Sequence, residues 1–160
     1  MNVQSQIAKH FRELHFGGNW TWINLKDSLT GITWQQATTA VYSFNTIAKL
    51  VYHINYYVSV IISVLQNEPL NASYKYSFDC PPIQSQDDWE KLVSKTFTDA
   101  ENFIMLVEQL PDEKLEATFV NDKYGNYYRN LQGVIEHTHY HLGQIVLIKK
   151  IVQQSTGSSV

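Results

Sequence analysis

The strongest constraint on the fold of this chain is a long apolar repeat in its first half. The segment IAKLVYHINYYVSVIISVL carries large apolar side chains at intervals of three and four residues. That spacing places them along one side of an α-helix, where they form a stripe that must be buried against other elements. The stripe consists of Ile47, Leu50, Ile54, Val58, Ile61 and Leu65.

Three further segments show the same helical spacing. The first covers residues 2–16 and is followed by two glycines, which stop helices. The next begins after Ser85, a good N-cap residue, and ends before Pro111. The last is expected to start at Tyr127 or Tyr128 and to end at Val152, before a polar tail.

A break is expected ahead of the apolar repeat. A single helix from Thr33 to Gln66 would be about 50 Å long, which is too long for the other elements. We therefore predict a short extra helix that Thr33 caps, with Gln36 completing a capping box. The main second helix should then begin near YSFNT, with Ser43 or Asn45 as its N-cap.

Four substantial helices and almost no strand signal predict an all-α protein with a four-helix bundle. A long loop, residues 67–86, joins the second and third helices and contains three of the four prolines. At 160 residues the chain is expected to form one bundle domain over residues 1–152, with a flexible tail at 153–160.

Charge and composition exclude several classes of partner. The net charge is −3 and no basic run occurs, so we expect no nucleic-acid partner. We find no window of about 18 apolar residues and therefore expect no membrane span. The N-terminus lacks the apolar core of a signal peptide. A single cysteine, Cys80, excludes an intramolecular disulfide and suits the cytoplasm.

The candidate functional feature is EHTHYHLGQI, which holds three of the six histidines. In a helix, His137 and His141 lie one turn apart on one face, whereas His139 points about 200° away from His137. The face of the pair also carries Val134 and Ile145, so it should point into the bundle. The pair is open to three interpretations, namely a metal site, core histidines with hydrogen-bond partners, and a pH-sensitive patch.

The other histidines differ in their expected roles. His53 lies in the middle of the apolar repeat and is the candidate third ligand, and the alternative is a boundary histidine bonded to a tyrosine. His10 and His15 flank the apolar stripe of the first helix and are expected at the surface. His139 is expected to face solvent or to support the ligands from outside.

The motif HTHYHLGQI, together with one histidine in the middle of the second helix, resembles the DinB-like superfamily, which includes relatives of the bacillithiol transferases. The family pattern matches His53, His137 and His141 as ligands, followed by Gly143 and Gln144. The resemblance implies a helical bundle in which the three histidines bind a divalent metal ion, zinc or nickel. The turn GGNW and the helix start TWQQA are similar to one branch of the family.

Three positions depart from the family pattern. Glu136 stands where Asn is common, and His139 stands where a small residue is common. Leu142 replaces the usual Arg and so removes a positive charge near the mouth of the expected site. These departures affect the surroundings of the ligands and leave the three histidines unchanged.

A metal ion held by three neutral histidines keeps its full charge and an open position, and it lowers the pKa of a water or thiol placed there. Two enzyme classes follow, a hydrolase and a thiol S-transferase that acts on a small molecule with a low-molecular-weight thiol. A hydrolase usually needs a separate general base, and Glu136 lies about 100° from His137. Thiol transfer is therefore favoured, and the resemblance points the same way.

The sequence also allows a non-catalytic role, in which the metal stabilises a binding or stress-response protein. An open coordination position would favour the enzyme. Gln144 shares the ligand face and is expected near the open side of the metal or in a supporting position. Four aromatic residues are candidates for a pocket wall, with simple packing as the alternative: Trp20, Trp22, Tyr56 and Tyr57. A homodimer is a further expectation of the resemblance.

Overall fold

The computed structural model describes residues 2–157, with side chains through Gln154, and within that range it is all-helical, as predicted. The α-helices are α1 (Val3–Phe16), α2 (Leu25–Leu29), α3 (Trp34–Thr38), α4 (Ile47–Leu65), α5 (Gln86–Glu108) and α6 (Tyr127–Gly157). Three 3₁₀ turns complete the described chain: η1 (Tyr74–Phe78), η2 (Asp112–Lys114) and η3 (Asp122–Tyr124).

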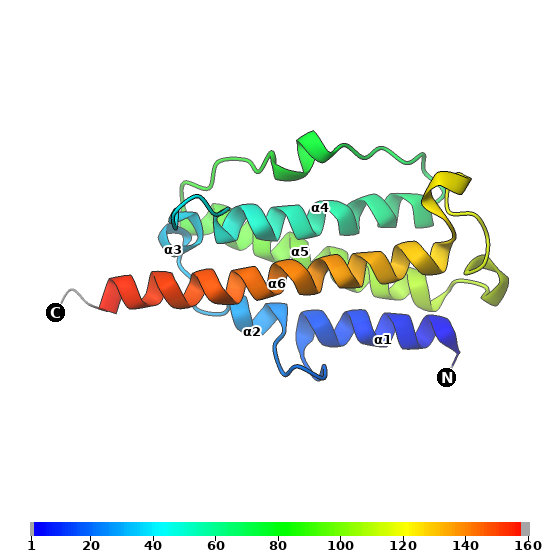
Figure 1. Ribbon diagram of the computed structural model, residues 1–160, viewed down its shortest axis with the longest axis horizontal. Coiled ribbons are helices and arrows are strands. Elements are labelled where there is room, and N and C mark those ends of the chain that lie inside the picture. The colour runs from blue at the N-terminus through cyan, green and yellow to red at the C-terminus, as the bar shows by residue number, and fades with distance from the viewer. Residues whose placement is uncertain (1, 158–160) are drawn as a thin grey trace.

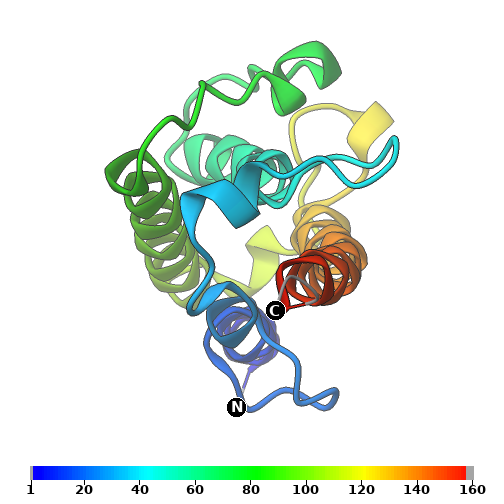
Figure 2. The same cartoon turned by 90° about the vertical axis from the view of Figure 1, so that its left-hand side faces the viewer.

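The four long helices run lengthwise and enclose one hydrophobic core (Figure 1). Figure 2 shows them end-on as four corners. Helix α4 packs against α5 and α6, and α1 packs against the same two helices from the opposite side. The core contains the largest fully buried side chains, among them Phe11, Leu14, Leu50, Ile54, Phe103, Ile104, Leu131 and Ile145.

Helix α4 contains the apolar repeat that dominates the sequence. Its stripe faces the core, because Leu50, Ile54 and Val58 are each at most 1% exposed. By length and composition α4 could cross a membrane, so the expectation that no segment reaches that apolarity is wrong for this helix. However, 61% of its apolar window is buried inside the protein, as in the core helix of a soluble protein.

The predicted break before α4 is present, but its capping residue differs from the prediction. Helix α3 begins with the predicted capping box of Thr33 and Gln36 and ends at Thr38. The N-cap of α4 is Thr46, whose side chain accepts a hydrogen bond from Lys49 N, so the prediction of Ser43 or Asn45 is wrong. Thr46 directly precedes the first stripe residue, and a cap one residue earlier would not reach the third helical N–H.

The ends of the other long helices follow the sequence closely. Ser85 caps α5 as predicted and accepts a hydrogen bond from Asp88 N. Helix α6 continues to Gly157, past the expected end at Val152, and the remainder of the predicted tail, residues 158–160, lies outside the described residues.

The long loop between α4 and α5 runs along the outside of α4 (Figure 1). It contains η1, which the sequence did not predict. Two contacts attach this part of the loop to α4: Ser73 N donates to Tyr56 Oη (2.8 Å), and Ser77 is fully buried against the helix. The loop therefore covers one side of α4 instead of extending into solvent.

Candidate metal centre

Three histidines from two helices converge on one point between α4 and α6. His53 comes from the middle of α4, and His137 and His141 come from successive turns of α6. One ring nitrogen from each residue lies within 4.8 Å of the others, and the Nε2 atoms of His53 and His137 are 3.0 Å apart. The structure thus brings together the three residues that the sequence proposed as ligands.

Hydrogen bonds from outside the group orient two of the three rings. The Nδ1–H of His53 donates to the backbone oxygen of Ser77 (3.1 Å), and the Nδ1–H of His141 donates to Gln144 Oε1 (3.0 Å). A neutral imidazole carries one N–H, so both Nε2 atoms present a lone pair. Metal-binding histidines are held in this way, with the second ring nitrogen bonded to a carbonyl or amide oxygen.

His137 lacks such a partner. Its Nδ1 is buried and has no hydrogen-bond partner among the described residues. Its Nε2 faces the lone pair on His53 Nε2. Without an ion, His137 can donate its Nε2–H across this gap, but its own Nδ1 lone pair then stays buried and unsatisfied, which is costly.

The environment keeps all three rings uncharged at neutral pH. Burial lowers the pKa of His137 to about 4, and the neighbouring His141 and His53 lower it further in the same direction. Burial also lowers the pKa of His53 and of His141, although their hydrogen bonds to Ser77 and Gln144 oppose the shift. Neutral histidines have the free lone pairs that a metal ion requires.

Aromatic rings enclose the group on several sides. Phe78 stacks on His53 with ring centroids 3.7 Å apart, and Tyr57 contacts both His53 (5.2 Å) and His137 (4.8 Å). Ser77 and Phe78 belong to η1 and were missed by the sequence analysis. Ser77 is 24 positions from His53, so no helical spacing links them. The aromatic density of the loop segment YKYSF is the one feature that could have drawn attention to it.

Two of the four predicted wall residues lie in solvent and line neither of two pockets that lie beside α4. Trp20 and Trp22 are 97% and 87% exposed, so both the pocket role and the packing alternative are wrong for them. The reason is the turn after α1, where Gly17 and Gly18 adopt positive φ and lead the chain outward. Asn19 holds this loop by donating to the backbone oxygen of Ile23 (2.7 Å), without help from the indoles.

The remaining histidines lie outside the group. His10 is exposed, as expected, and its ring is 5.7 Å from that of the half-buried His139. His15 was expected at the surface but is completely buried, so that prediction is wrong. Glu136 is exposed and forms a 3.6 Å ion pair with Arg129, away from the histidine rings.

The donor set fits a divalent metal ion. Zinc, nickel and similar ions accept neutral imidazole nitrogens, with zinc–nitrogen bonds of about 2.0–2.1 Å. A tetrahedral ion with such bonds needs ligand nitrogens about 3.4 Å apart. The ring nitrogens of this group are separated by 3.0 Å to at most 4.8 Å, so binding needs side-chain shifts of about 1 Å. Among the described residues the group has three members, and three protein ligands leave one position open.

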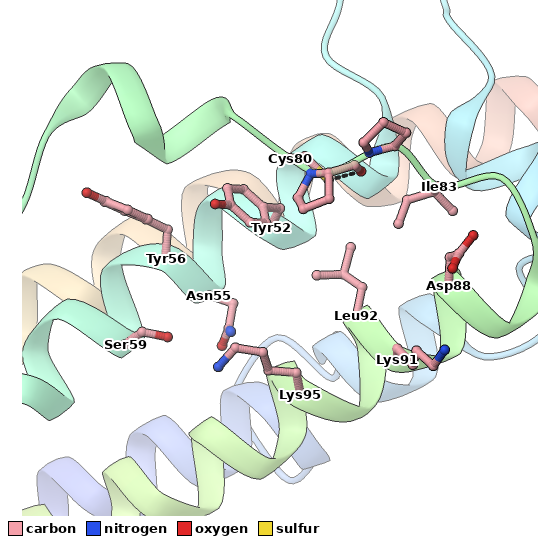
Figure 3. Close-up of a pocket in the computed structure, with 12 residues that line it drawn as sticks. Tyr52, Asn55, Tyr56, Ser59, Cys80, Ile83, Asp88, Lys91, Leu92 and Lys95 are labelled. Atoms are coloured by element: carbon pink, nitrogen blue, oxygen red, sulfur yellow. Dashed lines mark hydrogen bonds between the residues drawn. The ribbon is translucent and has the colours of Figure 1, made fainter.

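Of the cavities beside α4, two are of similar size, and one of these two reaches the histidines. A cleft of about 420 Å³ is lined by Tyr57 of α4 and His137 of α6. A second pocket of about 430 Å³ lies between α4, α5 and the long loop, with Tyr52, Asn55 and Cys80 among its lining residues (Figure 3). None of the three histidines lines the second pocket, so of these two cavities the cleft beside His137 is the one that adjoins the histidine group.

Comparisons of the chain with protein-family models, with curated proteins and with solved structures found no match in any of the three. The support for the candidate metal centre is therefore its geometry. Three neutral rings converge, two of them are oriented by hydrogen bonds from outside the group, and a cleft adjoins them.

Proposed function

We propose that this protein is a metal-dependent enzyme of the DinB-like type, in which His53, His137 and His141 bind one divalent ion, zinc or nickel. The observation that carries the proposal is the orientation of His53 and His141. Each ring is held through its Nδ1 by an oxygen outside the group, so that its Nε2 lone pair is left free. These two lone pairs and the Nε2 of His137, which lies 3.0 Å from His53 Nε2, form a set of donors that a divalent ion would satisfy.

Thiol S-transfer to a small molecule is the reaction that this arrangement supports best. When bound, a divalent ion supplies Lewis-acid chemistry, which lowers the pKa of a water or thiol at its open position. The chain contributes three neutral ligands, and Phe78 and Tyr57 shield His53 from water. Among the described residues, the carboxylate nearest in sequence to the ligands, Glu136, is exposed and paired with Arg129. Hydrolysis would need such a base beside the histidines, whereas thiol transfer does not.

A non-catalytic role is the second candidate, and one observation favours it. The histidines join α4 to α6, so an ion bound there would tie two of the four long helices together. An ion that binds the native state alone adds RT ln(1 + [L]/Kd) to stability, about 2.7 kcal/mol at 100 times Kd.

The test begins with metal analysis of protein purified without a histidine tag. We expect about one zinc or nickel ion per chain. The loaded protein is then assayed for conjugation of 2-mercaptoethanol to 1-chloro-2,4-dinitrobenzene and, separately, for hydrolysis of 4-nitrophenyl acetate, with His53→Ala as the control variant. Metal-dependent conjugation that His53→Ala abolishes supports the proposal.

The other outcomes are equally informative. Metal-dependent ester hydrolysis without conjugation would make the protein a hydrolase. Stoichiometric metal with neither activity would favour the stabilising role. Absence of metal binding would overturn the proposal altogether. The cytoplasmic location and the homodimer stay predictions.

A further inference from the structure

The cleft beside His137 has a composition that the metal site alone does not explain. It lies between α4, η3 and the first turns of α6 and has a volume of about 420 Å³. Its lining residues are Tyr57, Ile61, Lys123, Tyr124, Arg129, Asn130, Gly133, Val134 and His137. Two of these side chains are cations, and no acidic residue occurs among the described residues that line the cleft.

The two cations are available to a ligand. Arg129 Nη1 is 3.6 Å from Glu136 Oε2, but these side chains are 66% and 71% exposed, and such surface pairs contribute little. Lys123 Nζ lies 5.2 Å from the centroid of the Tyr124 ring, a contact that leaves its donors free on the other side. An anion in the cleft can therefore approach either charge without breaking a strong interaction.

The floor of the cleft leads from Arg129 to the metal-binding group. Arg129, Gly133 and His137 are spaced four residues apart on α6, so they lie in line along one helix face over about 12 Å. A Cβ atom at Gly133 would lie 3.4 Å from Arg129 Nη1, at the limit of ordinary van der Waals contact. The guanidinium therefore lies over Gly133, where a side chain larger than alanine would meet it.

The opposite wall of the cleft is fixed in place. Asn130 Nδ2 donates to the backbone oxygens of Tyr124 (2.9 Å) and Asn126 (2.8 Å). These bonds hold η3, which carries Lys123, against the start of α6. The two cations therefore lie on connected, preorganised elements, which lowers the entropic cost of binding.

We propose that the cleft binds a small organic anion, with its carboxylate or phosphate between Arg129 and Lys123 and its reacting end at the three histidines. A planar guanidinium and an ammonium are the usual partners of such groups. Arg129 and His137 are about 12 Å apart along the axis of α6. The side chains cover part of this distance, so a small molecule a few bonds long is enough to cover the rest. This inference rests on the proposed function and names the class of its substrate.

The test uses cobalt-loaded protein, because bound Co²⁺ and its ligand exchange are visible by absorption. Two thiols of similar size serve as probes: 3-mercaptopropionate, which is an anion, and 2-mercaptoethanol, which is neutral. We expect the anionic thiol to bind about tenfold more tightly at low salt, and this preference to weaken as salt rises. Arg129→Gln and Lys123→Gln should each reduce the preference several-fold, whereas Lys150→Gln, an exposed control on α6, should not.

A variant that keeps both charges provides a second check. Gly133→Val should push the guanidinium away and weaken 3-mercaptopropionate binding while cobalt content stays at one per chain. Equal affinity for the two thiols would mean that the carboxylate is not recognised. A preference that survives both charge substitutions would mean that the carboxylate binds the ion alone. Either result overturns the anion site. If no cobalt binds, the proposed function fails, and the anion site fails with it.

Discussion

His15, which is completely buried, and His137, which is half-buried, show how differently two histidines can be used in one bundle. Burial lowers the pKa of each to about 4, and each has one buried ring nitrogen without a partner. His15 lies against Phe11, with centroids 4.1 Å apart, and donates from Nδ1 to Phe11 O. His137 instead faces the imidazoles of His53 and His141.

Burial of a ring nitrogen and a lowered pKa therefore do not by themselves identify a metal ligand. Both properties follow from desolvation of a ring in an apolar interior. What distinguishes the group of His53, His137 and His141 is convergence, because three lone-pair donors occupy one place. The unpaired Nε2 of His15 is a local cost of packing, whereas the ring of His137 lies beside two other imidazoles.

Removing one converging ring should have the largest effect. His141→Ala should abolish stoichiometric metal binding, because the two remaining ligands chelate poorly. In the parent protein, metal at 1,000 times Kd should raise the free energy of unfolding by about 4 kcal/mol, and this increment should disappear in the variant. Metal content and urea unfolding with and without chelator measure both effects. Retention of metal by His141→Ala would show that convergence is not the cause of binding.

Acidification should distinguish His15 from the group. The unfolded histidine takes up a proton near pH 6.5, but buried His15 resists protonation until about pH 4. The unfolded state thus binds more protons in this window, so stability falls as pH drops, by about 3 kcal/mol for His15. In His15→Phe, with chelator present, unfolding curves between pH 7 and 4 should lose that part of the decline. An unchanged decline would show that His15 is not the group responsible.

Gln144→Ala tests whether orientation from outside matters. The substitution removes the oxygen that accepts from His141 Nδ1 and leaves all three ligands in place. Loss of such a partner typically weakens metal binding by about 10–100-fold, or about 1.4–2.7 kcal/mol. Competition with a chelator of known affinity gives the value. A variant with unchanged affinity but a lower melting temperature would restrict Gln144 to a packing role.

The smallest effect is expected from His139→Ala. This ring lies beside His10 and away from the group, and burial lowers its pKa without bringing it near the ligands. Stability should change by less than about 0.5 kcal/mol, and metal content should not change. Isothermal titration with the metal checks the second point. Loss of metal here, with His141→Ala unaffected, would mean that the helical phase assigned to α6 is wrong.

Much of this site could be predicted from periodicity alone. A spacing of four residues determines that His137 and His141 share a helix face and that His139 does not. The apolar residues around the pair indicate which face is buried, as Ile145 shows at 0% exposure. The position of His53 in the middle of an apolar helix likewise followed from the sequence. These are local properties, because the geometry of a helix relates each residue to its neighbours along the chain.

Tertiary structure alone decided which faces meet and how wide each buried face is. Helix α1 is covered by α5, α6 and the short α2, so its buried face extends far enough to include His15. The bond from His53 to Ser77 joins positions 24 apart, and the exposure of Trp20 and Trp22 depends on where a glycine turn directs the loop. Periodicity gives an angle around one helix axis, but burial depends on how many neighbours surround that axis, and packing between distant segments sets that number.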